Sequence, residues 1–173
     1  MKKTAIIVSV LLGGFWIFSL FNQPHKPTAK AATSTSTTSA ACTLHGELPD
    51  PICTPGDVNP AVTQANISTT ICKQGWTKTV RPSISYTAML KHQSIKDYGY
   101  KDTSPKLYEE DHLIPLELGG SPDSVKNLWA EPAPSPNKKD DVEYALNRSV
   151  CNGSMTLSEA QHRIATNWTT ATK

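Results

Sequence analysis

The sequence lacks a strong excess of charge of either sign. Its 173 residues include 17 basic and 15 acidic side chains, a formal net charge of +2, and charged residues make up 18% of the chain. Four of the lysines precede residue 32, so residues 32–173 hold 13 basic against 15 acidic side chains. This balance excludes the strongly basic domains that bind nucleic acid through bulk charge.

The one long uncharged hydrophobic run lies near the N-terminus. Lys2 and Lys3 precede the run Ala5–Phe21, which contains no charged residue. This order is typical of a signal peptide, with Ala29–Ala31 as a small-residue cleavage site. The run of 17 residues is also close to the ~17–25 that span a bilayer, so a retained anchor is the alternative. Residues 1–31 are therefore predicted to be a signal peptide or an N-terminal membrane anchor.

Both alternatives place the rest of the chain outside the cytoplasm, in the periplasm or the extracellular space, because the N-terminal lysines stay on the cytoplasmic side. Residues 32–41 contain only Ser, Thr and Ala, a composition that cannot bury enough apolar surface to order the backbone. We predict a flexible Ser/Thr-rich linker there, followed by a single domain over residues 42–173.

The four cysteines lack the Cys-x-x-Cys spacing of a zinc ribbon. An even number of cysteines in an exported chain indicates two disulfides, for which three pairings exist. We favour Cys42 with Cys53, because the loop between them bears Pro and Gly without apolar periodicity and needs a local link. Cys72 then pairs with Cys151. Buried free thiols are the alternative.

Proline and glycine are too frequent for a long coiled coil or a simple helical bundle. The chain holds 13 prolines and nine glycines, and the prolines interrupt helical runs. Local patterns predict a short helix over 60–67, a strand over 71–80, a helix over 85–97, strands within 107–118 and 125–129, a helix from 135 and a final helix from 156. We therefore expect a small α+β domain containing a β-hairpin, with the Met and Tyr stripe of the 85–97 helix and Trp129 in its core.

Acidic side chains concentrate in the hairpin and the helix after it. Residues 107–145 contain nine acidic residues against three lysines, which suggests a bound cation. Asp111 on the first strand and Asn137 at the helix start carry the oxygen ligands that suit a hard divalent ion. His112 points to the other side of the pleat from Asp111 and can take a proton. We expect Asp111 to hold the metal and His112 to activate water.

Three segments of this region resemble a known motif. DHLIPLELGG, NLWAEP and NKKD, in this order, are similar to the HNH nuclease pattern of the His-Me finger, or ββα-metal, endonucleases. The resemblance covers about residues 108–151, a quarter of the chain. It implies that the α+β domain is built around a ββα-metal finger, in which a β-hairpin and the following helix together hold a metal ion.

The resemblance also implies roles for individual residues. His112 is the expected general base, and Asp111 is a metal ligand. Asn127 is expected to fix the hairpin and orient His112. Asn137 matches a second metal-ligand position, and Lys139 matches a helix lysine that contacts substrate phosphate; a solvated helix face is the alternative for this lysine.

Two departures from the family pattern concern the metal site. Many members carry His at the position of Asn137 and a zinc-binding cysteine pair around it. Here prolines occupy positions 132, 134 and 136 of the loop, and the cysteines lie elsewhere. The site is therefore weaker or is completed by other side chains, for which the candidates are Glu110, Glu131 and Asp140.

A basic stretch precedes the hairpin. Residues 71–106 contain seven basic residues against two acidic ones, a local excess of +5. We expect Lys78 and Arg81 in this stretch to bind phosphate, and Tyr86, Tyr98 and Tyr100 are candidates for stacking on bases. A solvated basic face with core tyrosines is the alternative.

These patterns predict an exported endonuclease that hydrolyses phosphodiester bonds of DNA, with RNA as a further substrate. Little sequence preference is expected, because no recognition helix or zinc finger is present. The expected cofactor is one divalent metal ion, Mg²⁺ first and Mn²⁺, Ca²⁺ or Zn²⁺ as alternatives. We expect a monomer. The alternatives are a non-enzymatic envelope binding module on the same scaffold and another metal-dependent envelope hydrolase, such as a peptidoglycan peptidase.

Overall fold

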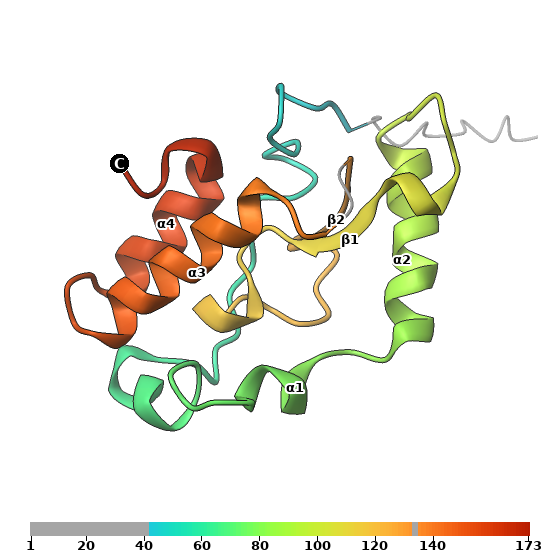
Figure 1. Ribbon diagram of the computed structural model, residues 1–173. Coiled ribbons are helices and arrows are strands. Elements are labelled where there is room, and N and C mark those ends of the chain that lie inside the picture. Colours follow the sequence, from blue (N-terminus) through green and yellow to red (C-terminus); the bar gives the residue numbers. More distant parts are fainter. Residues whose placement is uncertain (1–41, 133–134) are drawn as a thin grey trace, which may run out of the picture. The chain divides into compact units, whose positions relative to one another are not determined.

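A computed structural model describes residues 42–132 and 135–173 (Figure 1). The predicted signal peptide or anchor and the predicted linker lie outside these residues. Within the described ranges, no helix is both long enough and apolar enough to cross a bilayer.

The described residues form an α+β structure around a two-stranded antiparallel sheet. Strand β1 (Glu109–His112) pairs with β2 (Leu128–Glu131), with Asp111 opposite Trp129 and His112 opposite Leu128. Because side chains alternate across a strand, Asp111 and His112 point to opposite faces of the sheet. The predicted hairpin is confirmed, although its second strand begins three residues later than expected.

Helices cover both sides of the hairpin (Figure 1). Helix α2 (Ile84–Asp97) contacts both strands on one side, and α3 (Lys138–Cys151) and α4 (Leu157–Asn167) lie on the other. The predicted helix over 85–97 and the final helix are confirmed. Side-chain caps explain where they begin, since Ser83 accepts a hydrogen bond from the Tyr86 amide and Thr156 accepts one from the Glu159 amide. The remaining short helices are α1 (Trp76–Val80) and the 3₁₀ turns Gln64–Thr69, Pro105–Leu107, Leu116–Leu118 and Trp168–Thr170.

The short helix expected over 60–67 is instead the 3₁₀ turn Gln64–Thr69, and two expectations for residues 71–97 are also wrong. Residues 71–80 form turns and α1 instead of a strand, because Gly75 adopts a left-handed φ of 80° and the Lys78 amide bonds back to its carbonyl. Met89, which was expected in the core, is 58% exposed. Helix α2 buries Ile95 instead, against Tyr108 and Ala130 of the sheet side.

The main core lies between α3, α4 and the connection that joins the two strands. Leu118 of this connection, Val150 of α3 and Ile164 of α4 are all fully buried within one hydrophobic cluster. Trp129 of β2 is also fully buried, as predicted. The hairpin is therefore held from both sides, which makes it a rigid platform for side chains at its edge.

Both predicted disulfides are present. Cys42 is bonded to Cys53, and Cys72 to Cys151 at the end of α3. Disulfides form and persist in oxidising compartments, so this pair indicates an exported protein.

Replacing Cys72 and Cys151 by serine should lower the free energy of unfolding by about 2–4 kcal/mol, because the bond closes a long loop in the unfolded chain. The sequence separation is 79 residues, against 11 for Cys42–Cys53. Serine replacements at Cys42 and Cys53 should therefore cost less, and urea denaturation of both double variants measures the difference. A larger loss at Cys42 and Cys53 would contradict this loop-length explanation.

Candidate functional site

His112, the last residue of β1, is held in one orientation. Its side chain is 7% exposed, and Nε2 lies 2.9 Å from the carbonyl oxygen of Pro122. A carbonyl oxygen can only accept, so Nε2 carries a hydrogen and the neutral ring presents Nδ1 as the proton acceptor. No hydrogen-bond partner of Nδ1 is found in the part of the chain that the structure describes.

Burial also keeps the His112 ring neutral. Loss of water lowers the pKa of the imidazole below its ordinary value, and the positive charges of Arg81 and Lys139 act in the same direction. The Pro122 carbonyl and Asp111 oppose this shift without reversing it. At neutral pH His112 is therefore a neutral base with a defined tautomer, which is the state that a general base requires.

Asn127 fixes the connection that carries Pro122. Its side chain is fully buried, accepts a hydrogen bond from the Ile114 amide at 2.9 Å, and donates to the carbonyls of Ile114 and Ser121, each at 3.0 Å. Gly120 permits this approach, because a Cβ there would lie 1.7 Å from the Ile114 carbonyl oxygen. Ser121 directly precedes Pro122, so Asn127 positions the carbonyl that orients His112.

Asp111 lies on the opposite face of β1 and contacts two donors. Its Oδ2 accepts hydrogen bonds from Trp129 Nε1 at 3.0 Å and from Lys139 Nζ at 2.8 Å. The side chain of Asp111 is 12% exposed. Its position is therefore determined by the hairpin register, through Trp129, and by α3, through Lys139.

Lys139 is buried, although it was expected to contact phosphate at the surface. The side chain is 1% exposed, and Nζ binds Asp111, Glu143 Oε1 at 2.5 Å and the His112 carbonyl oxygen at 2.9 Å. Burial alone would lower the pKa of this ammonium, but the two carboxylates raise it above its ordinary value. Lys139 thus links α3 to β1 as a permanent cation, and this placement gives no support to phosphate binding.

Glu143 is a member of this group that sequence reasoning missed. It lies one helical turn after Lys139 on α3, and burial raises the pKa of its carboxyl to about 8 although Lys139 opposes the shift. Residues four apart on a helix are neighbours, so the spacing of Lys139 and Glu143 in the sequence could have indicated this ion pair.

Asn137 caps α3, which begins at Lys138, later than the predicted start at residue 135. Its Oδ1 accepts a hydrogen bond from the Lys139 amide at 2.8 Å, and its Nδ2 donates to Glu131 Oε2 at 3.2 Å. Asp140 completes the cap by accepting from the Asn137 amide at 2.7 Å. Asp140 was a candidate for completing the metal site, but in this structure its carboxylate supports the helix terminus.

Two further carboxyls share the face of Asp111. Glu131 is 4% exposed, and burial, followed by the charge of Asp111, raises the pKa of its carboxyl to about 7. Glu109 is two residues before Asp111 on β1, and its buried Oε2 has no hydrogen-bond partner among the described residues. Burial raises the pKa of Glu109 as well. The ammonium of Lys139 pairs with Asp111 and Glu143 only. This face therefore carries further acidic side chains that have no ion-pair partner in the part of the chain that the structure describes.

A divalent cation fits this surplus of carboxylates. In the described residues, no group of three or more His, Cys, Asp or Glu side chains is arranged to hold a metal ion. A Mg²⁺ ion does not need such a group, because it keeps several waters and is bound through one or two carboxylates. Glu109 Oε2, which has no hydrogen-bond partner among the described residues, and the Asp111 carboxylate are oxygen ligands of the kind that Mg²⁺ binds.

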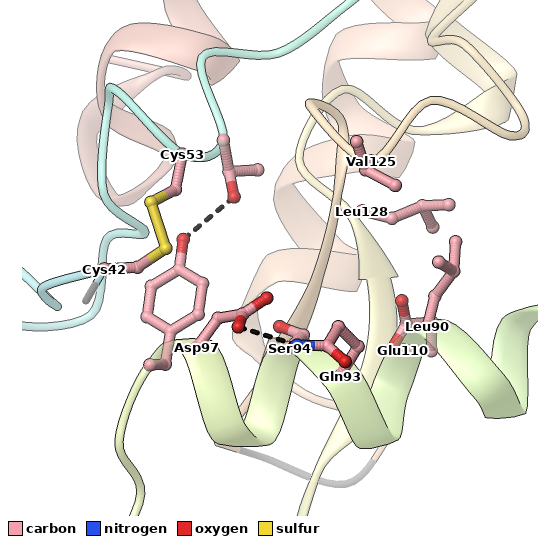
Figure 2. Close-up of a pocket in the computed structure, with 11 residues that line it drawn as sticks. Cys42, Cys53, Leu90, Gln93, Ser94, Asp97, Glu110, Val125 and Leu128 are labelled. Carbon is pink, nitrogen blue, oxygen red and sulfur yellow. Dashed lines mark hydrogen bonds between the residues drawn. A yellow bond between two sulfur atoms is a disulfide. The ribbon is translucent and has the colours of Figure 1, made fainter. Parts of the chain in front are cut away.

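Glu110 lies away from this face, so it is not placed to complete a metal site at Asp111. It points toward α2 and lines a cavity of about 230 Å³ (Figure 2). Both carboxylate oxygens are buried and have no hydrogen-bond partner in the described part of the chain. Burial raises the pKa of this carboxyl to about 8.

The predicted phosphate-binding residues Lys78 and Arg81 are exposed on α1 and directly after it. Arg81 lies close enough to His112 for its charge to lower the pKa of the imidazole. Tyr98 and Tyr100 instead stack on each other with their ring centroids 5.9 Å apart. The structure thus places the charge of Arg81 within electrostatic range of His112 but uses these two tyrosines for packing.

Comparisons of the chain with protein-family models, with curated proteins and with solved structures gave no match. The resemblance to HNH nucleases rests on the three segments quoted above, and the function proposed below rests on the geometry of the site.

Proposed function

We propose that the protein is an exported, metal-dependent endonuclease with a ββα-metal finger formed by β1, β2 and α3. The observation that carries this proposal is the hydrogen bond between His112 and the Pro122 carbonyl. It leaves Nδ1 of a neutral imidazole as the proton acceptor, next in sequence to an acidic residue on the opposite face. A surface hairpin pair without chemical function would not need a buried, oriented histidine.

In the proposed reaction, His112 Nδ1 takes a proton from a water molecule that attacks the scissile phosphorus. The Pro122 carbonyl then stabilises the imidazolium, because it accepts a hydrogen bond from Nε2 in both protonation states. Arg81, near His112, attracts the phosphate and balances charge that develops on it. Asn127 positions this arrangement through the Ser121 carbonyl and does not contact the reacting atoms.

A divalent ion, when bound, would supply a positive charge that stabilises the phosphate oxygens and the leaving 3′ oxygen. Asp111 is the proposed principal ligand. Asn137 is a weaker candidate, since its Oδ1 already accepts from the Lys139 amide. Mg²⁺ is the expected ion, with DNA as the substrate and RNA as a further substrate.

Cleavage of plasmid DNA should require a divalent cation. We expect excess chelator to abolish nicking and added Mg²⁺ to restore it, because the acidic side chains on the face of Asp111 outnumber its one ammonium and a divalent ion would favour their ionised forms. The assay is a chelator titration on plasmid and RNA, with Mg²⁺-saturated chelator as the control. Nicking by pure protein in excess chelator would rule out the metal role.

The second candidate is a non-enzymatic binding module of the cell envelope. It is favoured by the ammonium of Lys139, which lies 2.8 Å from Asp111 Oδ2 and so already provides this carboxylate with a cation. If no cleavage occurs with Mg²⁺, Mn²⁺, Ca²⁺ or Zn²⁺, this candidate is preferred. A peptidoglycan peptidase would need several His or Cys ligands for zinc, and no such group is found among the described residues.

Export itself is supported by the two disulfides. That residues 1–31 act as a cleaved signal peptide or as a retained membrane anchor remains a proposal, since these residues lie outside the described part of the chain.

A further inference from the structure

The cavity beside Glu110 lies on the same face of the hairpin as His112. Glu110 and His112 are two residues apart on β1, which places them roughly 7 Å apart along the strand. Leu128, the cross-strand neighbour of His112, also lines the cavity. A ligand in this cavity would therefore lie next to the proposed reaction centre.

Glu110 contributes to the cavity wall a carboxyl group that has no hydrogen-bond partner among the described residues. Both of its oxygens are buried, and neither meets a donor within the described ranges. A buried polar group without a partner is costly, so a ligand that brings hydrogen-bond donors would be favoured. In its ionised form this carboxylate has two acceptor oxygens side by side, which match two parallel N–H groups.

Apolar side chains form part of the cavity wall next to Glu110. Figure 2 shows Leu90 of α2 beside Glu110, with Val125 and Leu128 near them and the Cys42–Cys53 disulfide at the far end. The volume of about 230 Å³ exceeds the roughly 150 Å³ that holds a benzene molecule. The lining also contains the polar residues Thr54, Gln93, Ser94, Asp97 and Tyr98. Small-ligand sites commonly combine apolar side chains with a few placed polar groups in this way.

We propose that this cavity binds a guanine base of the nucleic acid substrate, with Glu110 accepting hydrogen bonds from N1–H and the N2 amino group. Among the common bases, guanine alone presents two adjacent N–H donors on its pairing edge, while adenine and cytosine present a donor beside an acceptor. A base can reach the cavity from single-stranded or unstacked nucleic acid. The inference rests on the proposed endonuclease function and adds to it a preference for guanine next to the cleaved bond.

The first test measures mononucleotide binding to the full chain by NMR titration. Hypoxanthine keeps N1–H and O6 but lacks the N2 amino group, so 5′-IMP is the matched probe for 5′-GMP. We expect 5′-GMP to bind roughly tenfold more tightly than 5′-IMP or 5′-AMP, because each analogue leaves one Glu110 oxygen unpaired. Glu110→Gln should remove the preference. The control is Glu159→Gln, the same charge change on the exposed surface of α4.

The second test maps cleavage of single-stranded oligonucleotides that carry one guanine or one inosine at the same position. Cutting should be favoured beside guanine over inosine, and Glu110→Gln should abolish this preference. If Glu110→Gln does not fold, the comparison of guanine with inosine in the unaltered protein still decides.

The outcomes separate the two proposals. Cleavage without guanine preference, together with equal affinities for 5′-GMP and 5′-IMP, would overturn the guanine pocket and leave the endonuclease proposal standing. Selective 5′-GMP binding that depends on Glu110, without cleavage under any metal, would support the pocket and overturn the nuclease.

Discussion

Replacing His112 by alanine is expected to lower the cleavage rate by roughly 10²–10⁴-fold, the usual contribution of a general base. The imidazole supplies the proton acceptor at Nδ1, and alanine removes it together with the hydrogen bond to Pro122. Metal affinity should change little, since the histidine side chain points away from the Asp111 face. Plasmid nicking gives the rate, calorimetry gives metal binding, and thermal unfolding verifies that the variant is folded. His162→Ala on the exposed surface of α4 is the matched control.

Asp111→Asn should affect metal affinity, which His112→Ala should leave nearly unchanged. The two variants together therefore distinguish the roles of these adjacent residues. The Asp111→Asn variant should bind metal more weakly, and part of its lost activity should return at high metal concentration. The amide keeps the size of the side chain, so packing against Trp129 is preserved. If His112→Ala lost metal affinity while Asp111→Asn kept it, the two roles would be inverted. If both variants cut DNA normally, the active site would lie elsewhere.

Lys139→Met should lower the free energy of unfolding by about 3–5 kcal/mol, which is the typical cost of removing one partner from a buried ion pair. The ammonium is 1% exposed and contacts Asp111, Glu143 and the His112 carbonyl. Methionine fills a similar volume, so the expected loss comes from the two carboxylates left without a cation. Urea denaturation monitored by Trp fluorescence measures the change.

Lys138→Met is the matched control for this variant. Lys138 precedes Lys139 on α3 but is exposed, so the same substitution there should change stability by less than about 0.5 kcal/mol. The double variant Lys139→Met with Asp111→Asn should lose less than the sum of the single losses, because it removes both members of one pair. Equal stability losses at positions 138 and 139 would show that Lys139 does not link α3 to β1.

Features set by local patterns were readable from the sequence. The hairpin, the helix over 85–97, the final helix and both disulfides were predicted correctly, because each depends on alternation, helical spacing, a cap or the spacing of cysteines. The opposite directions of Asp111 and His112 followed from the pleat of a strand. The strand expected over 71–80 failed because β-branched residues favour a strand only where a neighbouring strand can pair with it, and Gly75 instead begins a short helix.

The sequence by itself thus determined on which elements the candidate site residues lie. Only the tertiary structure decided what each of them contacts. The sequence predicts a surface position for Lys139, yet packing of α3 on the hairpin buries its ammonium between Asp111 and Glu143. Glu110 was a candidate metal ligand, yet α2 encloses it in a separate cavity with both oxygens unpaired. The burial and the hydrogen-bond partners of a side chain depend on residues far apart in the chain. No local sequence pattern indicates which helices and strands will pack together.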